Sequence, residues 1–154
     1  MVHSLSQLTY EGYNSVMQIR ELALTELDVA YDVIKELRTE LSYDDFEDLV
    51  YAMRHQEYRL YGIFEHDELV TCAGVCVQVN LYWKRHLYVH DLVTRATHRG
   101  RGYGREMLAY LQDVARMFNC SRIALTSGHQ RHDAHRFYEA NGFASVSAAF
   151  VKPL

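Results

Sequence analysis

The sequence predicts an α/β fold (α+β in some schemes), because strand-type and helix-type patterns alternate along the chain. In residues 69–83, apolar side chains recur at every second position, as in a strand with one buried face: Ala73, Val75, Val77, Val79 and Leu81. In residues 103–118 they recur at helical spacing: Met107, Leu108, Leu111, Val114, Ala115 and Phe118. A glycine-rich turn precedes that helix, and a strand-like run, residues 87–94, precedes the turn.

The other predicted elements follow in chain order. Residues 16–22 form a first strand, and a helix that opens at Thr25 or Glu26 carries apolar residues at helical spacing as far as Leu41. Ser42 precedes a second helix with acidic residues in its first turn. Two strands, 58–64 and 69–83, pair as a hairpin that turns at residues 65–68. The remaining elements are a strand at 121–127, a short helix from Ala134 that stops at Asn141-Gly142, and a last strand at 144–151.

The composition indicates one ordinary globular domain, residues 1–154. Hydrophobic residues make up 49% and charged residues 23%, and a chain of 154 residues is long enough to bury a core. We expect neither a secretory leader nor a membrane span, and hence a cytoplasmic protein. Cys72 and Cys76 are expected to be reduced thiols in the core.

The glycine turn is Arg99-Gly100-Arg101-Gly102-Tyr103-Gly104, and Arg105 follows it. Backbone N–H groups at a helix N-terminus have no intrahelical partner and lie at the positive end of the helix dipole. Glycines let a phosphate approach those groups closely, and the arginines add positive charge. The turn therefore predicts a pyrophosphate site. It has neither the Lys-Ser/Thr pair of a P-loop nor the G-x-G-x-x-G spacing of a dinucleotide site.

The glycine turn resembles the R/Q-x-x-G-x-G/A acyl-CoA signature of the GNAT superfamily of N-acyltransferases, with Arg99, Gly102 and Gly104 at the defining positions. Downstream, Ala134-His135-Arg136-Phe137-Tyr138-Glu139-Ala140-Asn141-Gly142-Phe143 resembles the A-x-x-F/L-Y-x-x-x-G-F ending of the same superfamily. The element order, βααββ–βαβα–β, is similar as well. The resemblance implies a GNAT fold, with a mixed central sheet of six or seven strands flanked by about four helices.

The resemblance also implies a reaction: transfer of an acetyl group from acetyl-CoA, the acyl-donor co-substrate, to a primary amine by direct attack. It assigns CoA binding to residues 99–105 and to the backbone of Leu92, Val93 and Thr94. Those three residues would receive the pantetheine arm and polarise the thioester carbonyl. Arg131 stands where many members use an Asn for the pantetheine arm, so it is a candidate for a phosphate or for a substrate carboxylate instead.

A base is needed, because an alkylammonium with a pKa of ~10.4 costs about 4–5 kcal/mol to deprotonate at pH 7. Where many family members carry Glu before the turn, this chain has Tyr88, His90 and Asp91. His90, with an ordinary pKa near ~6.5, suits the role directly. Asp91 would need a raised pKa, or would act through water or hold the substrate cation. A His-Asp pair that only ties strands together is the structural alternative.

Tyr138 matches the tyrosine that the family places beside the CoA sulfur, which makes it the candidate acid for the departing thiolate. Packing beside Phe137 is its structural alternative. A non-catalytic module that only binds acyl-CoA would keep the glycine turn without needing His90, Asp91 or Tyr138.

In this family, the first two helices and the loop between them usually form the wall of the acceptor site. In a chain of net charge −4, the acidic residues of this region include Glu36, Glu40, Asp44, Asp45, Glu47 and Asp48. An acidic wall would favour a cationic small-molecule or peptide amine, whereas solvated helix faces are the alternative. Tyr82 and Trp83 are expected either beside the site or in a homodimer contact. Neither a nucleic-acid nor a membrane partner is expected, and His129, His132 and His135 lack further ligands for a metal.

Overall fold

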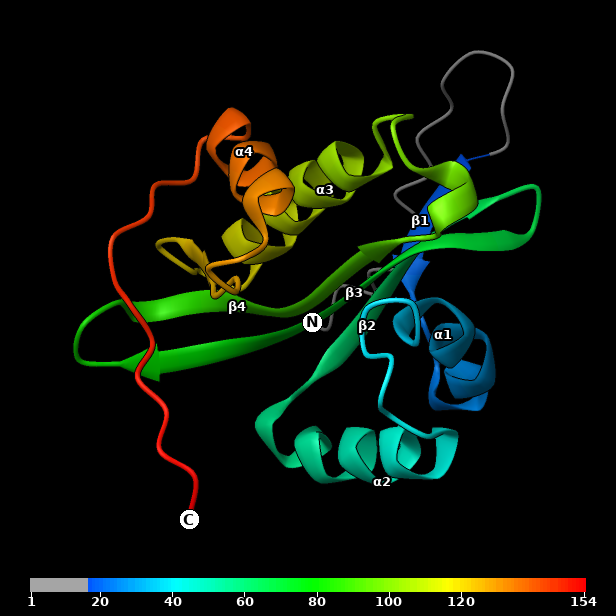
Figure 1. Cartoon of the computed structure of the whole chain (residues 1–154), viewed down its shortest axis with the longest axis horizontal. Coiled ribbons are helices and arrows are strands. Elements are labelled where there is room, and N and C mark those ends of the chain that lie inside the picture. Colours follow the sequence, from blue (N-terminus) through cyan, green and yellow to red (C-terminus); the bar gives the residue numbers. More distant parts are fainter. Residues whose placement is uncertain (1–16) are drawn as a thin grey trace. The chain divides into compact units, whose positions relative to one another are not determined.

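The computed structural model describes residues 17–154, and five strands form its one sheet, in the order β1-β2-β3-β4-β5 (Figure 1). The strands are β1 (Met17–Glu21), β2 (Arg59–Glu65), β3 (Glu68–Asn80), β4 (Lys84–Thr94) and β5 (Ile123–Leu125). The first four are antiparallel neighbours. β4 and β5 run in the same direction, since Ser121 N donates to Arg85 O and Leu87 N donates to Arg122 O further along both chains. The sheet is therefore mixed, as expected.

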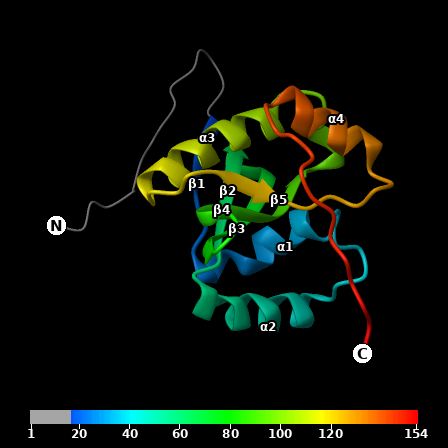
Figure 2. The same ribbon diagram turned by 90° about the vertical axis from the view of Figure 1, so that its left-hand side faces the viewer.

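Helices cover both faces of this sheet. α1 (Leu27–Ile34) and α2 (Tyr43–Met53) lie on one face, and α3 (Tyr103–Met117) lies on the opposite face (Figures 1 and 2). The chain divides into two compact units, one ending at Ala124 and one running from Leu125 to Leu154, and the second unit holds α4 (His132–Ala140). No helix among the described residues is long and apolar enough to cross a membrane.

The core confirms the helical periodicities. On α3 the buried residues are Tyr103, Met107, Leu108, Leu111, Val114 and Ala115, as the spacing predicts. A second cluster, between α1, α2 and the sheet, includes Ile34, Phe46 and Val50. Cys72 and Cys76 are both free thiols and both buried. Ser42 caps α2 as predicted, with its Oγ accepting from Asp45 N at 3.1 Å.

The first predicted helix ends earlier than its periodicity suggested. α1 stops at Ile34, and residues 35–40 form turns rather than helix. Leu37 N and Arg38 N both donate to Ile34 O, at 2.9 Å each, which closes the helix with a tighter turn. Leu37 and Leu41 still pack against the apolar cluster. The apolar spacing therefore continues beyond the end of the helix, because the residues of the loop also contact the core. This correction matters because it places Arg38 in a loop.

Two strand predictions are also corrected. β3 ends at Asn80 instead of Trp83, because Asn80 Oδ1 accepts from Trp83 N at 2.6 Å and holds a turn there. Val79, near the end of β3, and Leu81, beyond it, are exposed instead of sharing a buried face. The predicted strand at 144–151 is wrong: residues 143–154 belong to no helix or strand. A strand needs a hydrogen-bonded neighbour, and the described sheet has five strands rather than six or seven.

Candidate active site

An irregularity in the sheet brings His90 and Asp91 to the same side of β4. The β3–β4 register pairs Gly74 with Asp91 but Val75 with Val89, so His90 is an extra residue on β4, in a bulge. Neighbouring residues of a regular strand point to opposite faces, whereas a bulge re-aims one of them. Here both His90 and Asp91 line one cavity. The two predicted base candidates therefore share a site.

Asp91 is held by two side chains that sequence reasoning did not identify. Tyr58 Oη donates to Asp91 Oδ2 at 2.8 Å, and Arg38 Nε donates to Asp91 Oδ1 at 2.9 Å. Arg38 Nη2 also donates to the backbone O of His90 at 2.9 Å. The Asp91 side chain is 14% exposed. Both carboxylate oxygens accept hydrogen bonds, which fixes the orientation of the side chain. Its negative charge neutralises a neighbouring cation such as the Arg38 guanidinium.

A glycine makes room for this arrangement. A Cβ built on Gly74, which pairs with Asp91 across the sheet, would overlap the hydroxyl of Tyr58. Tyr58 is buried, and both burial and the Asp91 carboxylate raise the pKa of its phenol well above the usual value. The phenol is therefore protonated at neutral pH and remains a donor to Asp91. The sequence feature that could have indicated this close contact is Gly74 itself, a glycine within a predicted strand.

His90 is electrostatically suited to be a neutral base. Burial lowers the pKa of its imidazole, and the charge of Arg38 lowers it further, while Asp91 acts in the opposite direction. The ring packs edge-on against Tyr88, at 4.7 Å between centroids, and the amide nitrogen of Gln78 lies 3.5 Å from Nε2. At neutral pH the imidazole is therefore uncharged and able to accept a proton.

The cavity that His90 and Asp91 line has a volume of about 590 Å³. Its walls come from the end of α1, the loop after it, and α2. The apolar lining residues are Ile34, Leu37, Leu41, Phe46, Leu49 and Met53. A cavity of this size, mostly apolar with a few convergent polar groups, is typical of a small-molecule site.

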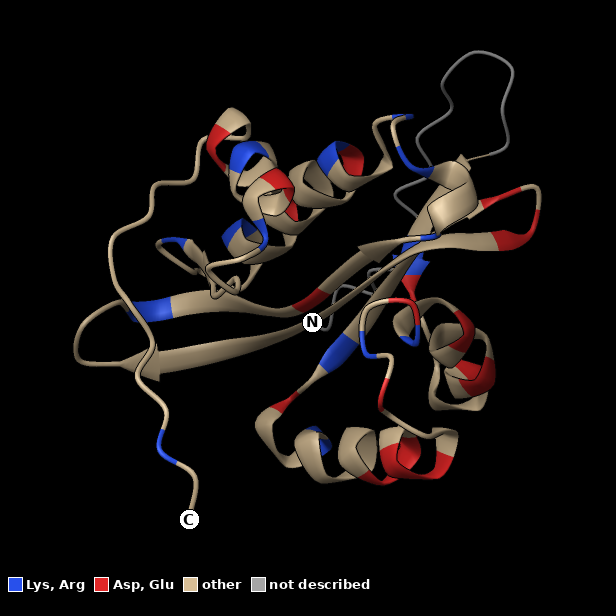
Figure 3. Ribbon diagram, in the orientation of Figure 1, with Lys and Arg blue, Asp and Glu red and all other residues tan. Residues whose placement is uncertain are grey.

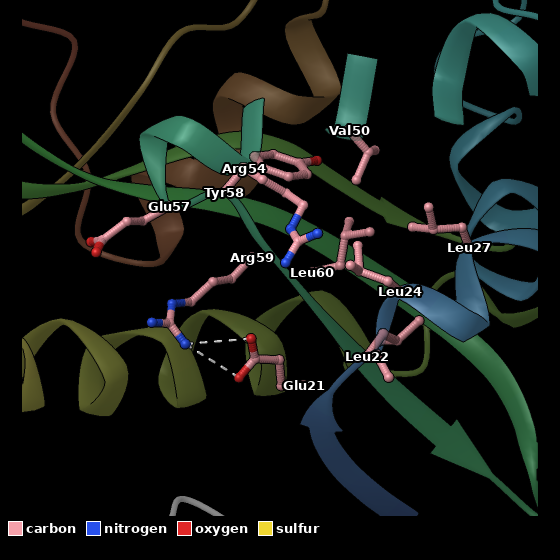
Figure 4. Close-up of a pocket in the computed structure, with 11 residues that line it drawn as sticks. Glu21, Leu22, Leu24, Leu27, Val50, Arg54, Glu57, Tyr58, Arg59 and Leu60 are labelled. Carbon is pink, nitrogen blue, oxygen red and sulfur yellow. Dashed lines mark hydrogen bonds and ion pairs between the residues drawn. The ribbon is translucent and has the colours of Figure 1, made fainter. Parts of the chain in front are cut away.

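A second cavity, of about 390 Å³, contains none of the predicted site residues. It is lined by residues of β1, α1, α2 and β2, including Glu21 and Arg59, which form an ion pair at 3.4 Å (Figure 4). Tyr58 lines both cavities.

The acidic residues of the first two helices lie mostly away from the site. Figure 3 shows them along α1 and at the beginning of α2. Of the six expected to form an acidic wall, only Glu40 lines the 590 Å³ cavity. Asp45 belongs to the cap of α2, Glu47 accepts from Tyr43 Oη, and Glu36 Oε1 accepts from Ala96 N.

The glycine turn has the conformation that an anion site needs. Gly100 (φ +77°) and Gly102 (φ +86°) both adopt the left-handed region, and a Cβ on either would meet open space. Gly102 is the N-cap of α3 and supplies no side-chain cap, so the first N–H groups of the helix have no capping side chain. Arg99, Arg101 and Arg105 are exposed around it. The turn therefore offers free donors and positive charge to a phosphate.

Tyr103 points the other way. Its ring is buried and its hydroxyl donates to Glu65 Oε2 at 2.5 Å, at the hairpin between β2 and β3. Burial, reinforced by Glu65, raises the pKa of this phenol. The side chain thus anchors the first turn of α3 to the hairpin.

Leu92, Val93 and Thr94 lie at the end of β4, beyond the part that β5 accompanies. Leu87 N donates to Arg122 O. Val89 lies two residues beyond Leu87, and Ala124 lies two residues beyond Arg122. Because β5 ends at Leu125, it does not extend as far as Leu92. On the other side, Thr94 pairs with Thr71 of β3, with 2.9 Å between the two Oγ1 atoms. A short 3₁₀ helix, Ala96–His98, connects this part of β4 to the glycine turn.

The second compact unit holds Tyr138 and Arg131. Tyr138 lies on α4 and packs its ring against Phe137 and Phe143, at 5.4 and 5.6 Å between centroids. Burial raises the pKa of its phenol, while the charge of Arg131 opposes the shift. Tyr138 is therefore protonated at neutral pH. Arg131 is the exposed N-cap residue of α4, and Gly142 (φ +87°) follows the helix, as predicted.

Comparison with known proteins identifies relatives over most of the chain. Residues 16–143 match the acetyltransferase (GNAT) family. The uncharacterised N-acetyltransferase YhdJ of Bacillus subtilis (strain 168) is 36% identical over 127 residues, which are 81% of this chain and 89% of that protein. An aminoalkylphosphonate N-acetyltransferase of Salmonella typhimurium is 28% identical over 149 residues, covering 94% of this chain and 96% of that protein.

Solved structures share the fold. Aminoglycoside N-acetyltransferase AAC(6')-Iy in complex with CoA superposes with a TM-score of 0.81, covering 91% of this chain and 95% of that chain at 14% identity. A ribosomal-protein-alanine N-acetyltransferase of Brucella melitensis gives a TM-score of 0.76 at 16% identity, covering 90% of this chain and 99% of that chain. The sequence match, the named relatives and the shared fold agree: this chain belongs to the acetyltransferase (GNAT) family and is an acyltransferase enzyme.

Proposed function

We propose that this protein transfers the acetyl group of acetyl-CoA to a primary amine, by direct attack of the amine in a ternary complex. The family match runs across both compact units, from residue 16 to residue 143, which supports one catalytic domain over residues 1–154. The observation that carries the proposal is the bulge in β4, because it aims His90 and Asp91 into one cavity of small-molecule size.

His90 is the base in this mechanism. Its pKa is lowered, so the imidazole is neutral at pH 7 and accepts the proton that the attacking ammonium loses. Asp91 holds the incoming ammonium beside His90 before the proton leaves. Its oxygens already accept from Tyr58 and Arg38, so the carboxylate is fixed in position rather than free to take the proton itself.

Acetyl-CoA binding falls to the glycine turn and the end of β4. The N–H groups at the start of α3 and the exposed Arg99, Arg101 and Arg105 bind the pyrophosphate. The backbone of Leu92, Val93 and Thr94 takes the pantetheine arm, and an N–H group there stabilises the oxyanion that forms on the thioester carbonyl. Arg131 is the candidate for an additional anionic contact.

The departing group is the CoA thiolate, and Tyr138 is the group that protonates it. Amine attack forms the new C–N bond, and collapse of the tetrahedral intermediate breaks the C–S bond, leaving the electron pair on sulfur. The raised pKa keeps the Tyr138 hydroxyl protonated and available to donate. A thiol has a pKa of ~8.5, so this proton transfer assists the reaction at neutral pH.

The acceptor is a primary amine whose other chemistry differs among the relatives. One relative is named for aminoalkylphosphonates, which combine an amine with an anion, and a structural neighbour for aminoglycosides, which carry several ammonium groups. Both chemistries belong in the test.

The experiment is thiol release from acetyl-CoA across a panel of aminophosphonates, amino acids, polyamines, aminoglycosides and lysine peptides, with the acetylated amine identified by mass spectrometry. His90→Gln is the variant that links turnover to the cavity, and it should lose turnover while still binding acetyl-CoA. If no amine is acetylated although acetyl-CoA raises the melting temperature, the protein binds acyl-CoA without transferring it and the proposal fails.

A further inference from the structure

Arg38 is a cation placed inside the acceptor cavity. Among the described residues that line the 590 Å³ cavity, it is the one lysine or arginine, and it lies in the loop that follows α1. Its bonds to β4 engage Nε and Nη2. A guanidinium has five N–H donors, and this side chain is 46% exposed, so further donors can serve a ligand.

This arginine conflicts with a simple cationic acceptor. Asp91 is the carboxylate that would receive a substrate ammonium, yet it already accepts from Arg38 and Tyr58. An ammonium that approaches Asp91 must lie beside the guanidinium, and two like charges at contact distance repel. An amine without an anion therefore competes with Arg38 for the same carboxylate.

An acceptor with its own anionic group removes the conflict. The anion binds the remaining donors of Arg38 and neutralises its positive charge, so the substrate ammonium can approach Asp91 without net repulsion. Building on the proposed function, we propose that the acceptor is a small zwitterion: a primary amine whose anionic group, a phosphonate or a carboxylate, is bound by Arg38 while Asp91 binds the ammonium.

The rest of the cavity supports a compact ligand of this kind. Apolar side chains, among them Leu37, Phe46 and Met53, form most of the wall and would contact a short carbon spacer. Glu40 is the other acidic residue in the lining, so the cavity does not present the acidic surface that a polycation would require. An arginine is also well suited to a phosphonate or carboxylate, because its planar donors match two oxygens at once.

The test compares amines that differ in the anion. The acceptors are 2-aminoethylphosphonate, β-alanine, n-propylamine and spermidine, each measured as kcat/KM at constant ionic strength. The quantity of interest is the ratio of the anionic acceptors to n-propylamine. We expect that ratio to exceed one in the wild type and to fall about 10–100-fold in Arg38→Gln, the loss expected for one hydrogen-bonded charge pair. Which anion gives the larger ratio separates a phosphonate from a carboxylate acceptor.

A matched control removes a neighbouring cation that does not line the cavity. Lys35 pairs with Asp32 at 2.8 Å on the outer side of α1, so Lys35→Gln should keep the wild-type ratio. The ratio also corrects for any loss common to all amines, which Arg38→Gln would cause by loosening Asp91. Equal ratios in Arg38→Gln and wild type, or a preference for spermidine, would overturn the zwitterion inference while leaving N-acetyl transfer established.

A binding measurement covers the case in which no amine is acetylated. Calorimetry of 2-aminoethylphosphonate and β-alanine with the CoA-saturated protein should show binding that Arg38→Gln weakens about 10–100-fold. Such binding without turnover would support the inference while the proposed transfer fails. Absence of Arg38-dependent binding for both anionic amines would overturn the inference.

Discussion

Tyr58 and Asp91 meet across the sheet, with the phenol donating a 2.8 Å hydrogen bond to Oδ2 of the carboxylate. The contact crosses the position of Gly74, where a side chain would occupy the space of the hydroxyl. The orientation of the Asp91 carboxylate thus depends on a residue without a side chain. This relationship links a packing requirement to the chemistry of the site.

Gly74→Ala should displace Tyr58 and free Asp91 Oδ2. We expect a loss of about 1–3 kcal/mol in the free energy of unfolding from overpacking and a lower kcat/KM for the amine. Tyr58→Phe separates the two effects, because it removes the hydrogen bond without adding volume. Denaturant unfolding and steady-state kinetics on both variants measure the outcome, and a Gly74→Ala protein with wild-type stability and activity would show that the glycine is not needed here.

His90→Gln should remove the acidic limb of the pH profile. Burial lowers the pKa of His90, so its neutral, active form is complete at neutral pH and is lost as the pH falls through a value below the usual 6.5. The wild-type kcat/KM should therefore rise with pH through that limb, and the variant should lose about 10²–10⁴-fold in kcat with no histidine limb. A variant that keeps the same limb would assign the titration to another group. Asp91→Asn, compared in parallel, should raise KM for the amine more than it changes the limb.

Gly102→Glu should abolish CoA binding while the protein stays folded. The new side chain would project into open space but carry a negative charge to the site proposed for the pyrophosphate. Gly102→Ala is the matched control, because both variants carry the strain of a left-handed residue, about 1–3 kcal/mol, and only one carries the charge. Calorimetric titration with CoA should show a loss of at least about 100-fold for Glu and a much smaller loss for Ala, as expected where charge rather than strain decides binding. Equal affinities in the two variants would place the pyrophosphate elsewhere.

The sequence was sufficient for features that depend on local physics. The apolar stripe of α3, the cap at Ser42 and the left-handed stop at Gly142 each follow from residues within a few positions of one another, and the structure confirms them. The prediction that His90 and Asp91 belong to the site remains a prediction, but their common cavity gives it a physical basis.

Features that depend on distant pairing could not be predicted. The bulge at His90 is a shift of register between β3 and β4. It cannot be predicted from the sequence of either strand taken alone, because it depends on how the two strands pair. Arg38 reaches Asp91 from 53 residues away, and its loop was predicted to be helix. The residues at 144–151, predicted to form a strand, likewise did not indicate whether a neighbouring strand exists. In each case the residue types were known from the sequence, but the distant segment with which they would pair was not.

Tyr138→Phe tests the acid role in the second compact unit. The substitution keeps the ring, and with it the contacts to Phe137 and Phe143, and removes only the hydroxyl. If that hydroxyl protonates the CoA thiolate, kcat should fall about 10²–10⁴-fold while the affinity for acetyl-CoA and the melting temperature stay close to wild type. The loss should also shrink as the pH rises, because a thiolate leaving group needs less protonation where thiols, with a pKa of ~8.5, ionise in solution. Turnover equal to wild type across the pH range would return Tyr138 to a packing role, since the aromatic contacts alone survive in the variant.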